Sequence, residues 1–417
     1  MTTHPRNYRF IILSSLLSKY EASTAFQEGS LGRRRPLQRI SDSPLASDYN
    51  DEMDYSKREA INSVLLELEA EGIVTLTWPK YRERTEVARV YLELGALDRA
   101  YELAGLTPKA TKISSLRAII EPLLAHPWDW VADWARSTDA ALNARKSAGL
   151  DLDAPDIYSS LVRVLLALPS LTESTPRRIF SQRVLGDSKE FEQRVEKVLL
   201  QVLRAHGPAE YETDEEYLDS VNLVVHPKLT LLAGELEFAL NGAEISLENF
   251  PGGLGLAHLS VKSLSISKLS LQAILTVENL TTYYQVIQHP RSPWGLVVYT
   301  GGFPHSGTKQ LLSRLAIMLN GNTKTPEVYH WGDIDYGGIR IFQHLKEAFF
   351  PSLRPYLMDV DTYRKHADHG LPFEQSYAER LQSLLQDARY QEWQPLLTEM
   401  LARKVRVEQE SVGAVIG

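Results

Sequence analysis

Three acidic side chains in the C-terminal half stand where strands are expected to end. Glu278 closes the apolar run ILTVE, and Asp333 and Asp335 close the run VYHWGDID. The carboxyl ends of parallel strands meet at one edge of a sheet, which is where open α/β sheets bind ligands. Strand alternation predicts that Asp333 and Asp335 share one side, with Ile334 on the other. The three carboxylates are therefore expected to lie together at that edge.

Carboxylates that share a site repel one another unless a cation lies between them. A few hard oxygen ligands that are open to water suit Mg²⁺ or Mn²⁺. Tyr336, Gly337 and Gly338 come next, and glycines allow a substrate backbone to come close. An aspartate after a strand can instead cap the next helix. Capping would explain Asp335 alone, whereas the three-residue pattern favours a metal site.

The segments around these residues alternate between strand and helix patterns. Apolar runs typical of buried strands are each followed by a helical pattern. The expected strands are 271–279, 295–302, 327–338 and 354–363, and the expected helices are 279–288, 306–319, 339–349 and several within 372–402. This alternation predicts an α/β fold with a mainly parallel sheet. Residues 223–250 alternate like antiparallel strands, and Asn241-Gly242 is a hairpin turn signal.

The first hundred residues follow a different order. Apolar spacings predict helices at 6–20 and 55–71, followed by strands at 73–78 and 86–92. Helices followed by a hairpin are typical of a winged helix, a fold that contacts DNA grooves and phosphates. Candidate DNA-binding residues are the wing residues Lys80, Arg82 and Arg84 and the basic run Arg33, Arg34 and Arg35. A module that contacts only protein stays open as the alternative.

The region between these parts is expected to be helical. Prolines divide residues 96–205 into short helical segments. Within them, the run RVLGDSKEFE at 183–192 predicts a short strand, a turn at Gly186 and a new helix.

The composition excludes several kinds of site. The chain has 417 residues and no cysteine, which excludes disulfides, thiolate nucleophiles and cysteine-ligated zinc or iron–sulfur clusters. Its formal net charge is −8, but an acidic mean still permits DNA binding by a local basic patch. No apolar run is long enough for a membrane span and no secretory pattern is present, so we expect a cytoplasmic protein.

The acidic motifs resemble a known domain. Glu278-Asn279 together with the later segment GDIDYGG resembles the Toprim domain of topoisomerases, primases and related nucleases. The segment TGGFPHSGTKQLLSRL at 300–315 is similar to one in the topoisomerase VI A subunit and the meiotic double-strand-break proteins, with His305 where an aspartate is usual. KVRVEQE at 404–410 resembles the closing segment of that group. RRIFSQRVLGDSKEFE, HWGDIDYGG and VEQE together resemble the JetD-like family of bacterial Wadjet plasmid-defence systems.

This resemblance implies a division into domains and a set of partners. It implies a winged-helix-like domain at 1–105, a helical connecting region at 106–215 and a nuclease domain at 216–417, with a Toprim core at about 270–410. JetD-like proteins are metal-dependent DNA endonucleases that cut closed circular double-stranded DNA together with an SMC–kleisin complex (JetABC-like). The resemblance also implies a bacterial cytoplasmic protein, a homodimer and no ATP site in this chain.

The resemblance also assigns roles to residues. Glu278 would be a metal ligand or a general acid/base, and Asp333 and Asp335 would hold one or two Mg²⁺ or Mn²⁺ ions. Residues that would support the site are Glu408, Glu410, His305 and Lys309. His330 lies near Asp333 in sequence and could contact phosphate. Asp359 and Asp361 repeat the spacing on the next expected strand, either as second ligands or as exposed edge residues.

Two alternatives belong to other functional classes. The chain could be a topoisomerase VI A-like DNA transesterase that uses a tyrosine, or a DNA-binding Toprim protein without catalysis. The first requires a nucleophilic tyrosine, and the family's paired motif is absent from residues 1–105, where Tyr55 and Tyr81 are the tyrosines considered. The intact acidic set argues against the second. We therefore expect hydrolysis without a tyrosyl intermediate.

Overall fold

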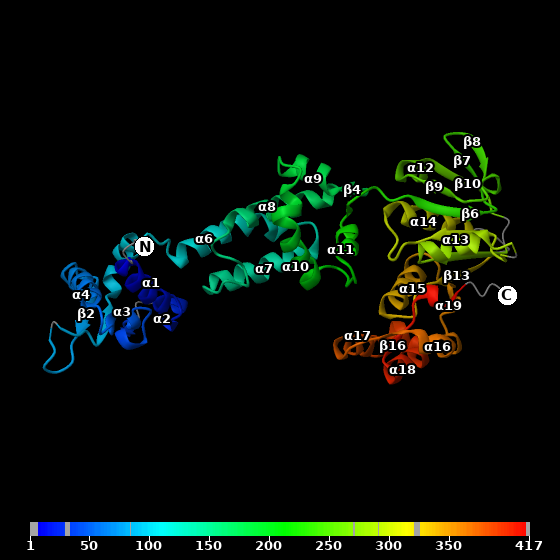
Figure 1. The fold of residues 1–417 in the computed structure, drawn as a ribbon. Coiled ribbons are helices and arrows are strands. Elements are labelled where there is room, and N and C mark those ends of the chain that lie inside the picture. Colours follow the sequence, from blue (N-terminus) through cyan, green and yellow to red (C-terminus); the bar gives the residue numbers. More distant parts are fainter. Residues whose placement is uncertain are drawn as a thin grey trace. The chain divides into compact units, whose positions relative to one another are not determined.

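The computed structural model describes residues 7–29, 34–83, 85–269, 272–290, 292–320 and 326–413. Contacts divide the chain into two compact units, Met1–Leu166 and Ala167–Gly417 (Figure 1). Each unit contains a hydrophobic core of its own. Among the described residues, no helix combines the length and apolar character needed to span a membrane.

The N-terminal unit contains the helices and the strand pair that the apolar spacing predicts. Helix α1 (Tyr8–Glu21) and helix α4 (Tyr55–Ala70) each bury one leucine-rich face. Strands β2 (Val74–Thr77) and β3 (Arg89–Leu92) are antiparallel, and β3 also pairs with an unpredicted strand, β1 (Leu37–Arg39). Shorter helices complete this part: α2 (Thr24–Glu28), α3 (Ala46–Tyr49) and α5 (Leu97–Ala104). Its identification as a winged helix stays a prediction.

The middle of the chain is helical, as expected. Its helices are α6 (Lys109–Ile120), α7 (Asp129–Asn143), α8 (Pro155–Ala167), α9 (Arg177–Val184), α10 (Glu196–His206) and α11 (Asp214–Ser220). The strand predicted within 183–192 is wrong, because α9 continues to Val184 and the chain turns at Gly186. The turn is held by packing rather than by strand pairing. The rings of Phe180 and Phe191 meet edge to face at 6.1 Å, and the Phe191 N–H donates to Ser181 Oγ.

A six-stranded sheet in the order β14-β13-β11-β12-β6-β9 organises the second unit. Four neighbouring strands are parallel: β11 (Ala273–Val277), β12 (Leu296–Tyr299), β13 (Glu327–Trp331) and β14 (Arg354–Pro355). Strands β6 (Thr230–Gly234) and β9 (Leu254–Leu256) extend it antiparallel. Ile274, Leu275 and Val277 are fully buried, as in strands covered on both faces. The predicted α/β fold is confirmed, and four neighbouring strands of this mixed sheet are parallel.

Helices follow the central strands in the predicted alternation. Helix α13 (Leu280–Gln288) follows β11, α14 (Ser306–Asn320) follows β12 and α15 (Tyr336–Ala348) follows β13, and α13 and α14 lie beside the sheet in Figure 1. A second sheet contains the predicted hairpin of β7 (Glu237–Leu240) and β8 (Ala243–Ser246). Its turn residues Asn241 and Gly242 both have positive φ, as the I′ turn requires. The remaining elements of this part are β4 (Thr175–Pro176), β5 (Leu223–Val224), α12 (His258–Ser263) and β10 (Leu264–Lys268).

The strand expected at 354–363 is mostly a helix. β14 covers only two residues, and α16 (Val360–His366) begins where the strand was predicted to continue. Asp359 is the N-cap of α16, and its carboxylate accepts the Thr362 N–H at 2.9 Å. Asp361 lies in the first helical turn with its side chain 86% exposed. Local capping therefore explains this acidic pair, and the prediction that it lies on a strand is wrong.

The C-terminal segment packs back against the sheet. Helices α17 (Gln375–Leu385) and α18 (Gln394–Arg403) occupy the region predicted to be helical. The chain then forms β16 (Val405–Arg406), which pairs with β15 (Leu371–Pro372), and ends in the short helix α19 (Gln409–Val412).

Candidate active site

The register of two parallel strands brings Glu278 and Asp333 together. Val277 of β11 lies opposite Trp331 of β13, so the residues that follow them emerge at the same level. The Glu278 N–H donates to the Trp331 carbonyl at 3.0 Å, and the Asp333 N–H donates to Glu278 Oε2 at 3.2 Å. The predicted convergence of these two acidic residues is thus a direct result of strand pairing.

Asp335 reaches the same place by another route. β13 ends at Trp331, and Asp335 is the N-cap of α15, where its Oδ1 accepts the Gly338 N–H at 2.7 Å. Ile334 is held by paired backbone hydrogen bonds with Val407 at 2.8 and 3.1 Å. The expectation that both aspartates belong to one strand is therefore wrong. Asp335 combines the capping role with a position beside the other carboxylates.

A glutamine that the sequence did not single out holds the centre of the site. Gln409 is 1% exposed, and its backbone N–H donates to Asp333 Oδ1 at 2.5 Å. Its side chain donates to the Trp331 carbonyl and accepts the Asn279 N–H, both at 2.9 Å. It therefore ties the C-terminal segment to both strand ends. Its position between two acidic residues, Glu408 and Glu410, is the only sequence signal for it.

Burial and mutual repulsion make the carboxylates weak acids. Burial is the largest cause of the raised pKa of Glu278, and the charges of Asp333 and Asp335 raise it further, well above its usual value. Burial also raises the pKa of Asp333 to about 6, against the hydrogen bond from Gln409. The pKa of Asp335 rises to about 6 through burial and then through the charge of Asp333. A cation at this place would relieve the repulsion.

The donor set fits a divalent cation, although the carboxylates are not arranged around one point. All three candidate ligands are carboxylates, which is the chemistry that Mg²⁺ and Mn²⁺ select. Among the described residues, however, no three Asp, Glu or His side chains are already placed to hold one ion. Asp333 Oδ1, Asp335 Oδ1 and Glu278 Oε2 each accept a backbone N–H. The second oxygen of each carboxylate accepts none of these three bonds, so binding would require side-chain rotations that bring these oxygens around one point.

Gly332 separates the site from a buried histidine. A Cβ at this position would lie 2.5 Å from Glu278 Oε2 and 2.9 Å from His330 Nε2, so no larger residue fits without displacement. His330 is fully buried, and its Nδ1 lies 2.9 Å from Thr276 Oγ1. Burial lowers its pKa to about 3. The suggestion that His330 contacts phosphate is wrong, because its ring is inside the protein.

The four supporting candidates have different environments. Glu410 accepts a hydrogen bond from Asn279 beside Glu278, and Glu408 is the N-cap residue of α19. The ring nitrogens of His305 lie 3.2 Å from the Gly307 nitrogen and 3.0 Å from Thr308 Oγ1, so this histidine caps the start of α14. Lys309 is one turn further along α14, where burial lowers its pKa and Asp219 opposes that shift. Only the two glutamates contribute to the electrostatics of Asp333.

Two arginines of the second unit stand beside the carboxylates. Arg406 Nη1 lies 4.0 Å from Asp335 Oδ2, and the guanidinium of Arg380 lies 4.1 Å from the centre of the Tyr336 ring. Tyr377 Oη accepts the Tyr336 N–H at 2.8 Å, which fixes the start of α15 between them. Neither arginine was among the site candidates: Arg380 reads as an ordinary residue of helix α17, and Arg406 lies within the KVRVEQE segment but was given no role of its own.

The predicted basic residues of the N-terminal unit are only partly described. Arg33 and Arg84 lie outside the described residues. Arg35 forms an ion pair with Glu93, and Arg82 pairs with Glu86 at 2.6 Å. Lys80 and Arg34 are exposed, and the Lys80 ammonium lies 5.0 Å from the centre of the Tyr81 ring. DNA binding by this surface stays a prediction, and two of its cations already have acidic partners.

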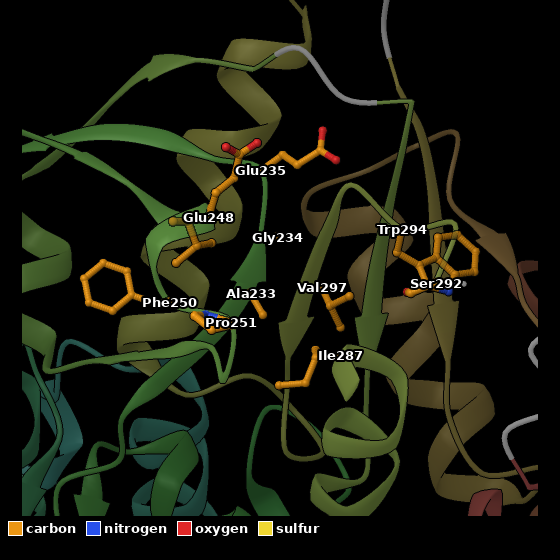
Figure 2. A pocket seen from close by; sticks show the side chains of 11 residues that line it. Ala233, Gly234, Glu235, Glu248, Phe250, Pro251, Ile287, Ser292, Trp294 and Val297 are labelled. Carbon is orange, nitrogen blue, oxygen red and sulfur yellow. The ribbon is translucent and has the colours of Figure 1, made fainter. Parts of the chain in front are cut away.

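A separate pocket lies on the antiparallel side of the sheet. It has a volume of about 350 Å³ and is bounded by β6, β12 and the end of α13 (Figure 2). Glu235, Glu248 and Phe250 line one side, and Ile287, Val297 and Trp294 line the other. None of the three clustered carboxylates lines this pocket, so it is distinct from the candidate active site.

Two comparisons with known proteins match this chain, one over its C-terminal part and one over almost its full length. A family described as "Wadjet protein JetD, C-terminal" matches residues 235–416, which include five of the six strands of the sheet and all three carboxylates. A Wadjet protein JetD from Bacillus cereus (strain Q1) is 39% identical over 407 residues, which cover 97% of this chain and 98% of that protein. The chain belongs to the JetD family. The resemblance to JetD-like proteins is thereby confirmed, and JetD membership makes it a Wadjet protein. The Toprim likeness stays a prediction.

Proposed function

We propose that this JetD-family chain is the DNA-cleaving subunit of a Wadjet defence system. It would be a Mg²⁺- or Mn²⁺-dependent endonuclease that cuts closed circular double-stranded DNA together with an SMC–kleisin complex. The observation that carries the proposal is the convergence of Glu278, Asp333 and Asp335 at the carboxyl ends of β11 and β13. Family membership supports the defence role.

The chain's own residues supply positioning and proton transfer. A bound divalent cation would polarise the scissile phosphate and stabilise the charge that develops on it. Asp333 and Asp335 would hold the cation, with ionised Glu278 as a third ligand, and Arg406 and Arg380 lie where they could pair with phosphate oxygens. Because its pKa is raised well above the usual value, the Glu278 carboxyl can retain a proton. In that form it would donate the proton to the leaving oxygen; in its ionised form it would instead accept a proton from the attacking water.

Cleavage by water rather than by tyrosine is part of this proposal. Tyr283 follows Glu278 on α13, but it is 1% exposed and its hydroxyl is buried. Tyr284 is 41% exposed on the same helix. No arginine motif accompanies this pair, and it does not belong to the winged-helix-like region in which the related transesterases carry their nucleophile.

The test uses the full chain with its SMC-type partners and closed circular plasmid DNA. Wild type, Glu278→Gln and Asp333→Asn would be compared in Mg²⁺, in Mn²⁺ and in EDTA. Asp359→Asn is the matched control, because it removes the same charge from a helix cap outside the acidic cluster. We expect linear DNA with protein-free ends from wild type and the control, and none from the other two. Protein-bound ends would instead indicate a transesterase.

The proposed oligomeric state has a separate test. Cutting both strands of a duplex requires two active sites, so we propose a homodimer. Light scattering after size exclusion would show twice the 47.1 kDa chain mass. A monomer that cuts both strands in the full complex would contradict this part of the proposal.

A further inference from the structure

A short acidic segment outside the matched C-terminal region lies against the candidate active site. Residues 210–216, here called the acidic strap, read EYETDEE and contain five carboxylates among seven residues. They precede residue 235, where the family match begins, and lie within the second unit. The strap contacts the turns that follow both β12 and β13.

The first contacts are with the start of α15. The Tyr336 hydroxyl donates to Glu210 Oε2 at 2.6 Å, and Arg380 Nη2 lies 3.2 Å from Glu212 Oε1. The other Glu212 oxygen approaches Gly337 so closely that a Cβ there would lie 2.8 Å from it. Gly337 directly follows the Asp335-Tyr336 pair. The strap therefore occupies the space that this glycine leaves open.

The second contacts are with the turn after β12. The ring of Tyr211 packs edge to face on Phe303 at 5.0 Å. Gly302 has a φ of +81°, and a Cβ there would lie 3.0 Å from Glu216 Oε1. In the turns after β12 and β13, a glycine thus leaves room for a carboxylate of the strap.

The strap is a preorganised turn rather than a loose loop. Glu216 Oε2 accepts the N–H groups of Glu212 and Thr213 at 2.9 and 3.1 Å, and Thr213 Oγ1 accepts the Glu216 N–H. This capping box fixes the start of α11 and with it the direction of Glu212. The arrangement holds exposed carboxylates in fixed positions at this edge of the sheet.

The charges explain why the strap would compete with DNA. Placing Glu212 beside Asp335 adds negative charge to an already acidic centre, and like charges at short range are unfavourable. The arginine Arg380 offsets this cost by pairing with Glu212. A phosphate oxygen is the natural partner of such an arginine in a nuclease. Glu212 thus holds the position on Arg380 that a DNA phosphate would take.

We propose that the acidic strap is an autoinhibitory substrate mimic, which covers the phosphate path across the site until DNA displaces it. This inference rests on the proposed function, because it assigns the displaced ligand as the DNA backbone. The Arg380–Glu212 pair is about one-third and one-quarter exposed. Exposed ion pairs are weak and are screened by salt. DNA that carries many phosphates could therefore replace the strap.

The experiment separates strap release from catalysis. Binding of a short fluorescent duplex would be measured by anisotropy in EDTA, so that no metal or cleavage is needed. The full-length variant Glu210→Gln/Glu212→Gln removes the two carboxylates that contact α15 and Arg380. The control Asp214→Asn/Glu215→Gln removes the same charge from the same segment. Asp214 pairs with Arg204, and Glu215 lines a pocket with Arg177 away from the site. Cleavage of closed circular plasmid by the chain alone in Mn²⁺ would be measured in parallel.

The two measurements have separate meanings. We expect the Glu210/Glu212 variant to bind DNA about tenfold more tightly than wild type and than the control, and to cut without partners. Tighter binding with no cleavage under any condition would support the strap but contradict the proposed nuclease. Equal DNA binding by the Glu210/Glu212 variant and the Asp214/Glu215 control would overturn the proposal that the strap is autoinhibitory. A loss of cleavage at unchanged binding would also overturn it, by placing Glu212 in the catalytic set.

Discussion

Replacing Asp335 with asparagine is expected to stabilise the metal-free protein while abolishing DNA cleavage. Asparagine is as good a helix N-cap as aspartate, so the hydrogen bond from the Gly338 N–H to the side chain is retained. What the substitution removes is a charge that is 9% exposed and stands beside Asp333. The side chain that weakens the fold is thus one of those proposed to bind the metal.

The size of the effect follows from the pKa of Asp335. Burial and the Asp333 charge raise it to about 6 from the unfolded value of 3.8, and two pKa units correspond to about 3 kcal/mol. This destabilisation is fully present above pH 6 and is lost as the pH falls towards 4, because the folded state then binds the proton more tightly. Since the asparagine amide is itself buried, we expect a net gain of about 1–3 kcal/mol. In a unit of this size that gain raises Tm by about 2–10 °C.

The assay is thermal unfolding in EDTA at pH 7.5 and at pH 4.5, with Asp335→Ala and Asp359→Asn as controls. Alanine removes the cap as well as the charge, so it should be less stable than asparagine by about 1 kcal/mol. Asp359→Asn changes a cap outside the acidic cluster and should leave Tm nearly unchanged. The reasoning is refuted if Asp335→Asn lowers Tm at pH 7.5. It is also refuted if the rise in Tm over wild type is as large at pH 4.5 as at pH 7.5.

Three further predictions concern the same strand ends. Binding of Mn²⁺, followed by electron paramagnetic resonance, should strengthen as the pH rises through about 6, because protons compete for Asp333 and Asp335; a flat profile from pH 5 to 8 would contradict this. Gln409→Ala should lower the free energy of unfolding by about 1–3 kcal/mol in denaturant titrations, because the Asn279 N–H loses its acceptor and the Trp331 carbonyl keeps only the hydrogen bond from the Glu278 N–H; unchanged stability would show that water replaces the amide. Gly332→Ala should weaken Mn²⁺ binding at least tenfold by calorimetry, because the added methyl displaces Glu278, and wild-type affinity would mean that Glu278 is not a ligand.

Sequence patterns were most informative where strand pairing alone determines position. The buried strand that ends at Val277 places Glu278 at the edge of the sheet, and parallel pairing with β13 brings it to Asp333. These features depend on the local apolar pattern and on the rule that parallel strands end at the same edge of a sheet. That is why they could be predicted. The approach of a substrate backbone to the glycines after Asp335 stays a prediction; in the structure, a Cβ on Gly337 would meet Glu212 and a Cβ on Gly338 would meet the Asp333 backbone.

Other parts depend on contacts that are distant in sequence. Gln409 reaches Asp333 only because Val407 pairs with Ile334, and no local pattern encodes that bridge. The acidic strap reads as an ordinary solvated charge run until the fold places Glu212 beside Arg380. The strand expected at 354–363 failed because the N-cap at Asp359 starts a helix there.

The most direct test of the metal centre is anomalous diffraction from crystals of the full-length protein soaked in Mn²⁺. The account predicts a manganese peak between the carboxylates of Glu278, Asp333 and Asp335, with the hydrogen bond from the Gln409 N–H to Asp333 lengthened or exchanged. The peak should be absent from Asp333→Asn crystals and present in Asp359→Asn crystals. A wild-type peak elsewhere in the chain, or no ordered manganese at saturating concentration, would contradict the assignment of these three residues.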